Sequence, residues 1–228
     1  VDVQITNATG LAADTVQDTY GNIVGHSTAG DALDTADGGN VALGCNAGGA
    51  LTDNLNNVAI GCHALAASAD DGDNNIAIGK LAMGVGDVSG ASNIAIGLSA
   101  ADAVTSGNDN IAMGSDAFGS ATTGICNIAI GANALLVSTT GCCNIAIGLT
   151  ALGGADTTGI NNIAIGTTAM DALTTGACNI AIGENALGAA TIGLKNIAIG
   201  QLAMSGVTTA QADDNIAIGR SALVGAAA

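Results

Sequence analysis

The chain has 228 residues, of which 35 are glycine, one is phenylalanine, one is tyrosine and none is proline or tryptophan, so it lacks the aromatic side chains of an ordinary globular core. Its formal net charge is −16, with 19 acidic residues against three basic ones, which leaves no basic face for nucleic acid and disfavours an anionic membrane surface. No apolar run approaches the roughly 18 residues that cross a bilayer, so we expect an acidic, elongated protein without a membrane-inserted segment.

Residues 1–39 are expected to form an N-terminal cap or docking segment ahead of a regular domain that spans residues 40–228. Val1, Val3 and Ile5 alternate with polar residues, which predicts a strand, and residues 21–25 form a degenerate copy of the repeat that follows. A repeat protein needs its end covered, because an open end is an unpaired strand edge. The chain begins at Val1 without a recognisable signal peptide, and we interpret it as a processed product or a fragment.

From Asn40 onward the chain is a tandem repeat with a period of 17 to 19 residues. Each unit reads Asn-(Ile/Val)-Ala-(Ile/Leu/Met)-Gly-x-x-Ala, and we call one unit a rung. The eleven rungs begin at Asn40, Asn57, Asn75, Asn93, Asn110, Asn127, Asn144, Asn162, Asn179, Asn196 and Asn215.

Each rung is expected to open with a short strand. Ile76 and Ile78 lie two residues apart, so a strand places both on one face and Ala77 on the other. The isoleucines are assigned to the core. The alanines then form a flat face that meets a three-fold neighbour or a sister chain or, if the two faces are reversed, the opposite side of the same rung. Gly79 ends the strand at a corner that needs a positive φ or a close backbone approach.

The rest of the rung is expected to hold a second short strand, carrying Ala82 and Met83 in one rung, and a turn of the type Thr122-Thr123-Gly124. Stacked rungs place the leading asparagines in a column whose amides hydrogen-bond along the stack. A lone rung cannot fold, since it buries about three large apolar side chains at roughly 1.5–3 kcal/mol each and orders its backbone at about 1–2 kcal/mol per residue. We therefore predict an all-β, parallel β-solenoid of about eleven rungs, roughly 4.8 Å per rung.

The six cysteines are placed by this stacking. Cys45 and Cys62 follow the glycine of adjacent rungs, and Cys126 and Cys143 precede the asparagine of adjacent rungs, so each pair lies at about the Cα separation of a disulfide. A disulfide and a pair of small apolar side chains both remain open for these pairs. Cys142 has no stacked partner and is free to reach another subunit. Metal binding is not predicted, because no CxxC pattern is present.

Two further motifs carry competing interpretations. The loop at residues 69–74 gathers three aspartates, which fits either a calcium site or a solvated turn, and its spacing matches no EF-hand. His26 and His63 are isolated in the sequence and are interpreted as turn residues. No catalytic, cofactor-binding or metal-ligating residue is assigned.

The last rung begins at Asn215 and ends without a polar cap, in Ala226-Ala227-Ala228. We expect another domain, or the Val1–Thr6 strand of a second copy, to continue the ladder there, which would give head-to-tail growth.

The unit Asn-Ile-Ala-Ile-Gly-x-x-Ala resembles the head repeats of YadA-like trimeric autotransporter adhesins, and also repeats of bacteriophage tail fibres. The resemblance covers residues 40–228 and is carried by the Asn, Ile, Ala, Ile and Gly positions. It implies a left-handed parallel β-roll, with three rolls packed around one axis. The rungs are longer than the usual repeat of that family, and no neck, stalk or anchor is recognisable.

The sequence thus favours a non-enzymatic structural or adhesive fibre that is extracellular, on a cell surface or on a virion. Its expected partners are copies of itself, as a homotrimer or a head-to-tail filament, and a host or surface receptor read by variable positions such as Lys80, Leu98, Glu184 and Gln201. A polysaccharide-degrading tailspike is disfavoured, since Tyr20 and Phe118 are the only aromatic residues. Ice binding is suggested by a column of threonines, for which a ladder closing the turn is the favoured alternative: Thr105, Thr122, Thr139, Thr157, Thr174 and Thr191.

Overall fold

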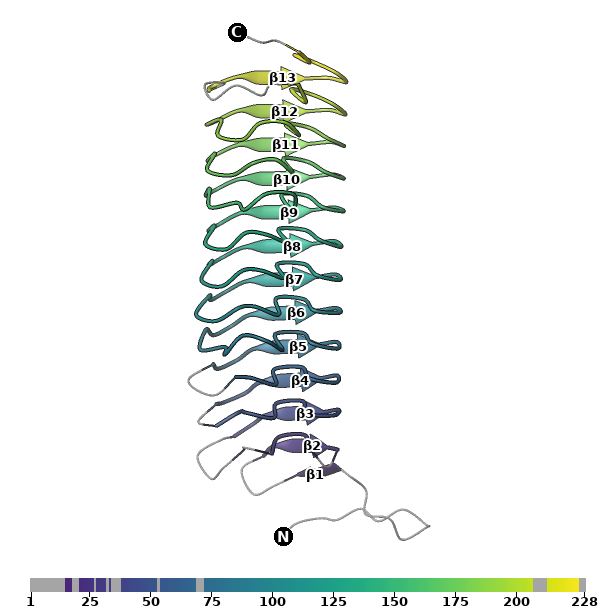
Figure 1. Ribbon diagram of the computed structural model, residues 1–228, viewed down its shortest axis with the longest axis vertical. Coiled ribbons are helices and arrows are strands. Elements are labelled where there is room, and N and C mark those ends of the chain that lie inside the picture. Colours follow the sequence, from purple (N-terminus) through teal and green to yellow (C-terminus); the bar gives the residue numbers. More distant parts are fainter. Residues whose placement is uncertain are drawn as a thin grey trace.

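The computed structural model describes residues 15–17, 21–26, 28–31, 33, 38–52, 54–68, 72–206 and 213–225. Its strands stack one upon another in a single sheet whose strand order follows the chain from β1 to β13 (Figure 1). Strands β2 to β13 pair in parallel, and β1 pairs antiparallel to β2. The predicted all-β parallel solenoid of about eleven turns is therefore confirmed.

Every strand has three residues. They are β1 (Thr15–Gln17), β2 (Ile23–Gly25), β3 (Val41–Leu43), β4 (Val58–Ile60), β5 (Ile76–Ile78), β6 (Ile94–Ile96), β7 (Ile111–Met113), β8 (Ile128–Ile130), β9 (Ile145–Ile147), β10 (Ile163–Ile165), β11 (Ile180–Ile182), β12 (Ile197–Ile199) and β13 (Ile216–Ile218).

Strand register follows the repeat. Ala77 of β5 lies opposite Ala95 of β6, and the same pairing of like with like continues from β3 to β13. The single-residue differences in period are absorbed between the strands, because a one-residue slip within a strand would exchange its two faces.

The degenerate copy at residues 21–25 is a rung of the same sheet. The backbone N–H of Asn40 donates to Asn22 Oδ1 at 2.8 Å, and β2 continues the parallel ladder. Its glycine comes one position early, however: Gly25 lies opposite Leu43, so His26 stands where the other rungs have their corner glycine, and it adopts a φ of 139°. The predicted strand at Val1–Ile5 lies outside the described residues.

The two faces of the strands are the reverse of our assignment. The alanines of β3 to β13 point inward and are at most 4% exposed, whereas the residues on either side of them point outward and are half-buried or exposed. The reason is that large side chains from the other side of the rung, such as Met83, Phe118 and Leu135, already fill the interior. Facing positions in a thin core alternate large with small, so only alanine fits opposite them.

The predicted second strand is also wrong. The segment after the corner glycine is a turn in which Leu81 and Met83 have φ values of 59° and 48°. The backbone N–H groups of this turn point in both directions along the stack. The N–H of Leu81 donates to Cys62 O in the preceding rung, and the N–H of Met83 donates to Ala100 O in the next rung. Inter-rung hydrogen bonds thus offset the strain of left-handed conformations that side chains other than glycine disfavour.

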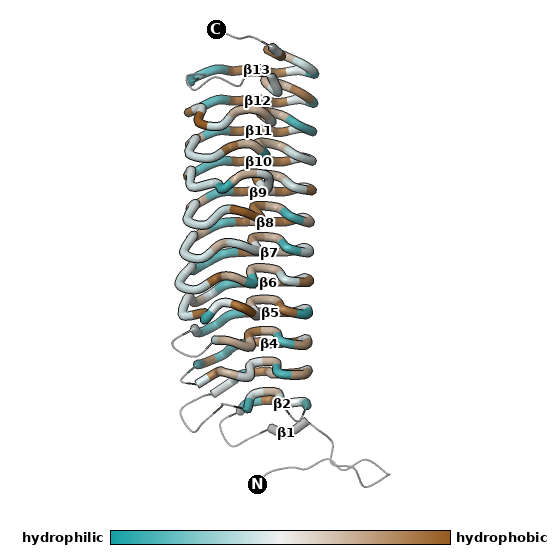
Figure 2. Tube along the Cα trace, in the orientation of Figure 1, coloured by the Kyte–Doolittle hydropathy of each residue, from teal (hydrophilic) through white to brown (hydrophobic). Residues whose placement is uncertain are grey.

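The corner glycine is confirmed on both predicted grounds. Gly79 has a φ of 134°, and a Cβ placed on it would lie 2.3 Å from the carbonyl oxygen of Gly97 in the next rung. In Figure 2 a hydrophilic stripe runs along the stack where the strands begin, beside strands that are hydrophobic. None of the described residues belongs to a helix long and apolar enough to cross a membrane.

Candidate functional site

The asparagine column forms the predicted ladder. The backbone N–H of Asn127 donates to Asn110 Oδ1 at 2.9 Å, and its side-chain amide donates to Gly141 O at 2.7 Å. Its own Oδ1 accepts the backbone N–H of Asn144 at 2.9 Å. The same bond from backbone N–H to side-chain oxygen joins Asn22 through Asn215, and these side chains are buried in all but the last rung. The column therefore has a structural role.

The threonines close the turns, as the favoured alternative to ice binding predicted. The Thr105 hydroxyl donates to Thr122 O at 3.0 Å, and the Thr174 hydroxyl donates to Thr191 O at 2.9 Å. The predicted column is wrong at Thr157, which is fully buried and donates to Leu173 O. In this rung the backbone N–H of Thr158 donates to Thr174 O, and the Thr139 hydroxyl of the preceding rung donates to Asp156 Oδ1 at 3.0 Å. The rung that begins at Asn144 is one residue longer than the next, and the pairing of threonines shifts there.

The outer face of the sheet is uncharged and apolar along the strands. Every outward strand position from β3 to β13 carries Val, Ile, Leu or Met, so two apolar columns run along the stack. Ile130, Ile147 and Ile182 are 36–37% exposed within this face, and at β13 Ile216 and Ile218 are 68% exposed. Large contiguous apolar surfaces, unlike scattered single residues, are typical of interaction sites in general.

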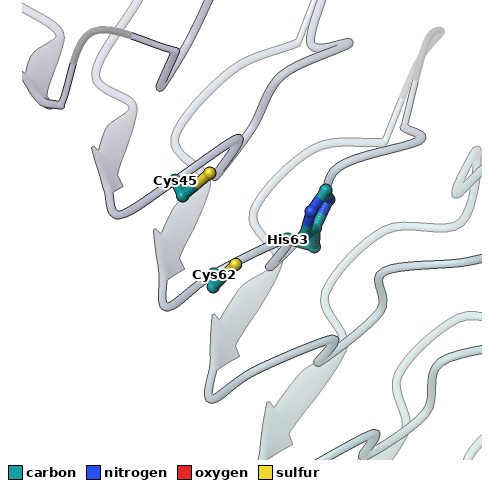
Figure 3. Close-up of side chains that lie close together, drawn as sticks. All are labelled: Cys45, Cys62 and His63. Atoms are coloured by element: carbon teal, nitrogen blue, oxygen red, sulfur yellow. The ribbon is translucent and has the colours of Figure 1, made fainter.

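All six cysteines are free thiols in the structure. Cys45 and Cys62 lie at the same corner of successive rungs, and His63 follows directly, so that one ligand atom of each residue lies within 4.8 Å of the others (Figure 3). We predicted the stacked cysteines but not the contribution of His63. The signal was available, because stacking brings residues 17 or 18 apart together and His63 is adjacent to Cys62.

The second cysteine pair has a different environment. Desolvation raises the pKa of the Cys126 thiol, and nearby Cys143 and Asp109 raise it further through like-charge repulsion. Cys142 directs its thiol to Thr140 O at 3.4 Å. No histidine accompanies these thiols in the part of the chain that the structure describes, so only the first pair offers a mixed thiol and imidazole ligand set.

The acidic loop at 69–74 is described only in part. Residues 69–71 lie outside the described residues, and the calcium interpretation rests on two aspartates among them. The Asp73 carboxylate bridges two rungs, because its Oδ1 accepts the backbone N–H of Leu55 at 2.7 Å.

Asp102 supplies a pH-dependent prediction. Burial raises the pKa of its carboxyl above the ordinary 3.8, and the negative charge of Asp116 raises it further. The folded protein therefore binds this proton more tightly than the unfolded chain, and this contribution to stability is lost as pH rises through the folded pKa. We expect Asp102→Asn to be more stable than the parent chain at pH 7, with the difference shrinking as pH falls toward the ordinary value. Urea denaturation at several pH values measures this, and Asp31→Asn, at an exposed position, is the control.

No family model, curated protein or solved structure matches this chain.

Proposed function

We propose that this chain is a non-enzymatic structural or adhesive fibre protein, extracellular or borne on a cell surface or virion, whose copies associate side by side. The observation that carries the proposal is the outer face of β3 to β13, where two apolar columns are half-buried or exposed. Reach and display need a long uniform body, and the stack of like rungs provides one.

A second copy is the occupant that this face fits best. Its side chains repeat at every rung, so it matches itself over a long contact without any new sequence. The chain carries a net charge of −16, and the outward strand positions carry none of it. Copies of like charge therefore meet with least repulsion across this face.

A three-fold arrangement is the form that the resemblance to trimeric adhesins suggests. The alanines are buried inside each rung, so they cannot line a three-fold axis, which was one of the alternatives for the alanine face in the sequence analysis. The isoleucine columns take that position in the proposal. A head-to-tail filament remains the alternative assembly, with a surface receptor read by corner residues such as Leu98, which is 49% exposed.

A polysaccharide-degrading enzyme receives less support from the described residues. Sugar sites use exposed aromatic platforms, but Phe118 is 1% exposed and packs in the core. The other aromatic residue, Tyr20, lies outside the described residues.

The double variant Ile130→Lys/Ile147→Lys tests the proposal. Two charges placed in an apolar interface lose hydration without a partner, so we expect the dissociation constant of the assembly to rise at least about 100-fold, equivalent to about 2.7 kcal/mol. Sedimentation velocity measures the change, and negative-stain microscopy separates trimers from filaments.

The matched control is Thr140→Lys/Thr158→Lys, which adds the same charges at exposed turn positions of the same two rungs. Assembly unchanged in this control and lost in the isoleucine variant supports side-by-side association. A parent chain that stays monomeric at high concentration contradicts it, and long filaments in both variants favour the head-to-tail alternative.

A further inference from the structure

The geometry points to a zinc site formed by Cys45, Cys62 and His63 across two adjacent rungs. Their ligand atoms lie within 4.8 Å of one another. Around Zn²⁺, bond lengths of about 2.3 Å to sulfur and about 2.0–2.1 Å to nitrogen place tetrahedral ligands roughly 3.3–3.8 Å apart. Closing the set around the ion therefore takes side-chain movements of about an ångström.

The backbone already holds these residues in position. The N–H of His63 donates to Cys45 O at 2.8 Å, which fixes the two corners against each other. His63 has a φ of 58°. In every rung from Asn46 to Ser221, the residue two positions after the corner glycine has a similar positive φ. The site therefore uses the standard corner of the solenoid and differs from other corners only in its side chains.

Supporting hydrogen bonds surround the three ligands. The Thr28 hydroxyl donates to Cys45 Sγ at 3.8 Å and accepts the backbone N–H of Asn46 at 3.0 Å. The Asn46 side-chain amide lies 3.1 Å from His63 Nδ1. A side-chain amide can accept a hydrogen bond through its oxygen or donate one through its NH₂ group, so Asn46 can pair with either tautomer of the His63 ring.

The donor types select the ion. Thiolate suits Zn²⁺ and Cu⁺, imidazole suits Zn²⁺ as well, and neither favours Ca²⁺ or Mg²⁺. Cys45 is exposed and Cys62 is half-buried, so the ion has an entry path and water can fill the fourth position. Bound zinc would tie together the rungs that begin at Asn40 and Asn57, near the end of the stack where repeat proteins open first.

Metal titration of the reduced, folded chain without a histidine tag is the test. We expect one equivalent of Zn²⁺ to bind, measured by competition with a chromophoric chelator. Co²⁺ in its place is expected to give a thiolate charge-transfer band. Cys62→Ser and His63→Gln should each weaken binding by more than the roughly 10–100-fold caused by loss of a supporting hydrogen bond. The control Cys126→Ser/Cys143→Ser removes the other stacked pair and should leave both measurements unchanged.

Three results would overturn the site. The first is a reduced parent chain that binds no zinc, and the second is affinity that survives both ligand substitutions. The third is loss of binding in the control variant. Far-UV circular dichroism of each variant establishes that it is folded, and Cys45→Ser serves in place of any ligand variant that is not. Mass spectrometry of the titrated sample verifies that Cys45 and Cys62 are thiols and not a disulfide.

Discussion

Gly148→Ala is expected to destabilise the centre of the solenoid by about 3–5 kcal/mol, the largest effect of any methyl-sized change that we consider. Gly148 has a φ of 136°, which L side chains rarely adopt. A Cβ on it would lie 2.5 Å from the carbonyl oxygen and 2.7 Å from the carbonyl carbon of Gly166. Both contacts are backbone, so relief requires the rungs to separate. Urea denaturation followed by circular dichroism measures the loss.

Substitutions at two other glycines distinguish the conformational strain of a positive φ from the backbone clash between rungs. Gly219 has a φ of 119° and nothing within 4 Å of its added Cβ, so Gly219→Ala should show the conformational strain without the clash. Gly119 does not have a positive φ, and its nearest contacts are 3.2 Å away, so Gly119→Ala should cost least. Equal losses in all three variants would show that rung-to-rung contact at the corner is not the cause.

The features that the sequence predicted well are those that repeat stacking determines. A strict Asn at the head of each rung could only form a column, and Asn127 and its equivalents do hydrogen-bond along it. A strict Gly after the strand indicated a corner, and Gly79 has both the conformation and the close contact expected. Here local pattern and tertiary packing express the same constraint.

The features that failed depend on what each rung packs against. Alternation showed that Ile76 and Ile78 lie opposite Ala77, but not which face is inside, since that is decided by Met83 and other large side chains arriving from the far side of the rung. The φ of 48° at Met83 was equally hidden, because intrinsic preference disfavours it and only the inter-rung hydrogen bonds compensate.

The cysteine and histidine cluster lies between these cases. The proximity of Cys45 and Cys62 follows from the period alone. The sequence-based interpretation of His63 is an isolated turn residue, because Cys62 is the only thiol or imidazole close to it along the chain. In a solenoid, residues one period apart are as close as neighbours in the chain, so ligand motifs must be read across rungs as well as along them.

Asn127→Ala is expected to cost about 3–4 kcal/mol by opening the asparagine ladder at one rung. The substitution removes the acceptor for the backbone N–H of Asn144, now bonded at 2.9 Å, and the donor to Gly141 O, now bonded at 2.7 Å. Both groups are buried away from water, and a buried polar group without a partner loses about 1–3 kcal/mol. Hydrogen exchange should also show faster opening on both sides of the rung.

The control is Gln201→Ala, which removes an exposed amide that donates to Glu184 Oε2 at 2.8 Å. Water replaces that bond, so we expect a change within about 0.5 kcal/mol. If Asn127→Ala behaved like this control, the ladder would contribute nothing beyond what solvent supplies. The strict Asn of the repeat would then need another cause. A loss confined to Asn127 would instead show that a buried amide column, together with apolar burial, holds successive rungs in register.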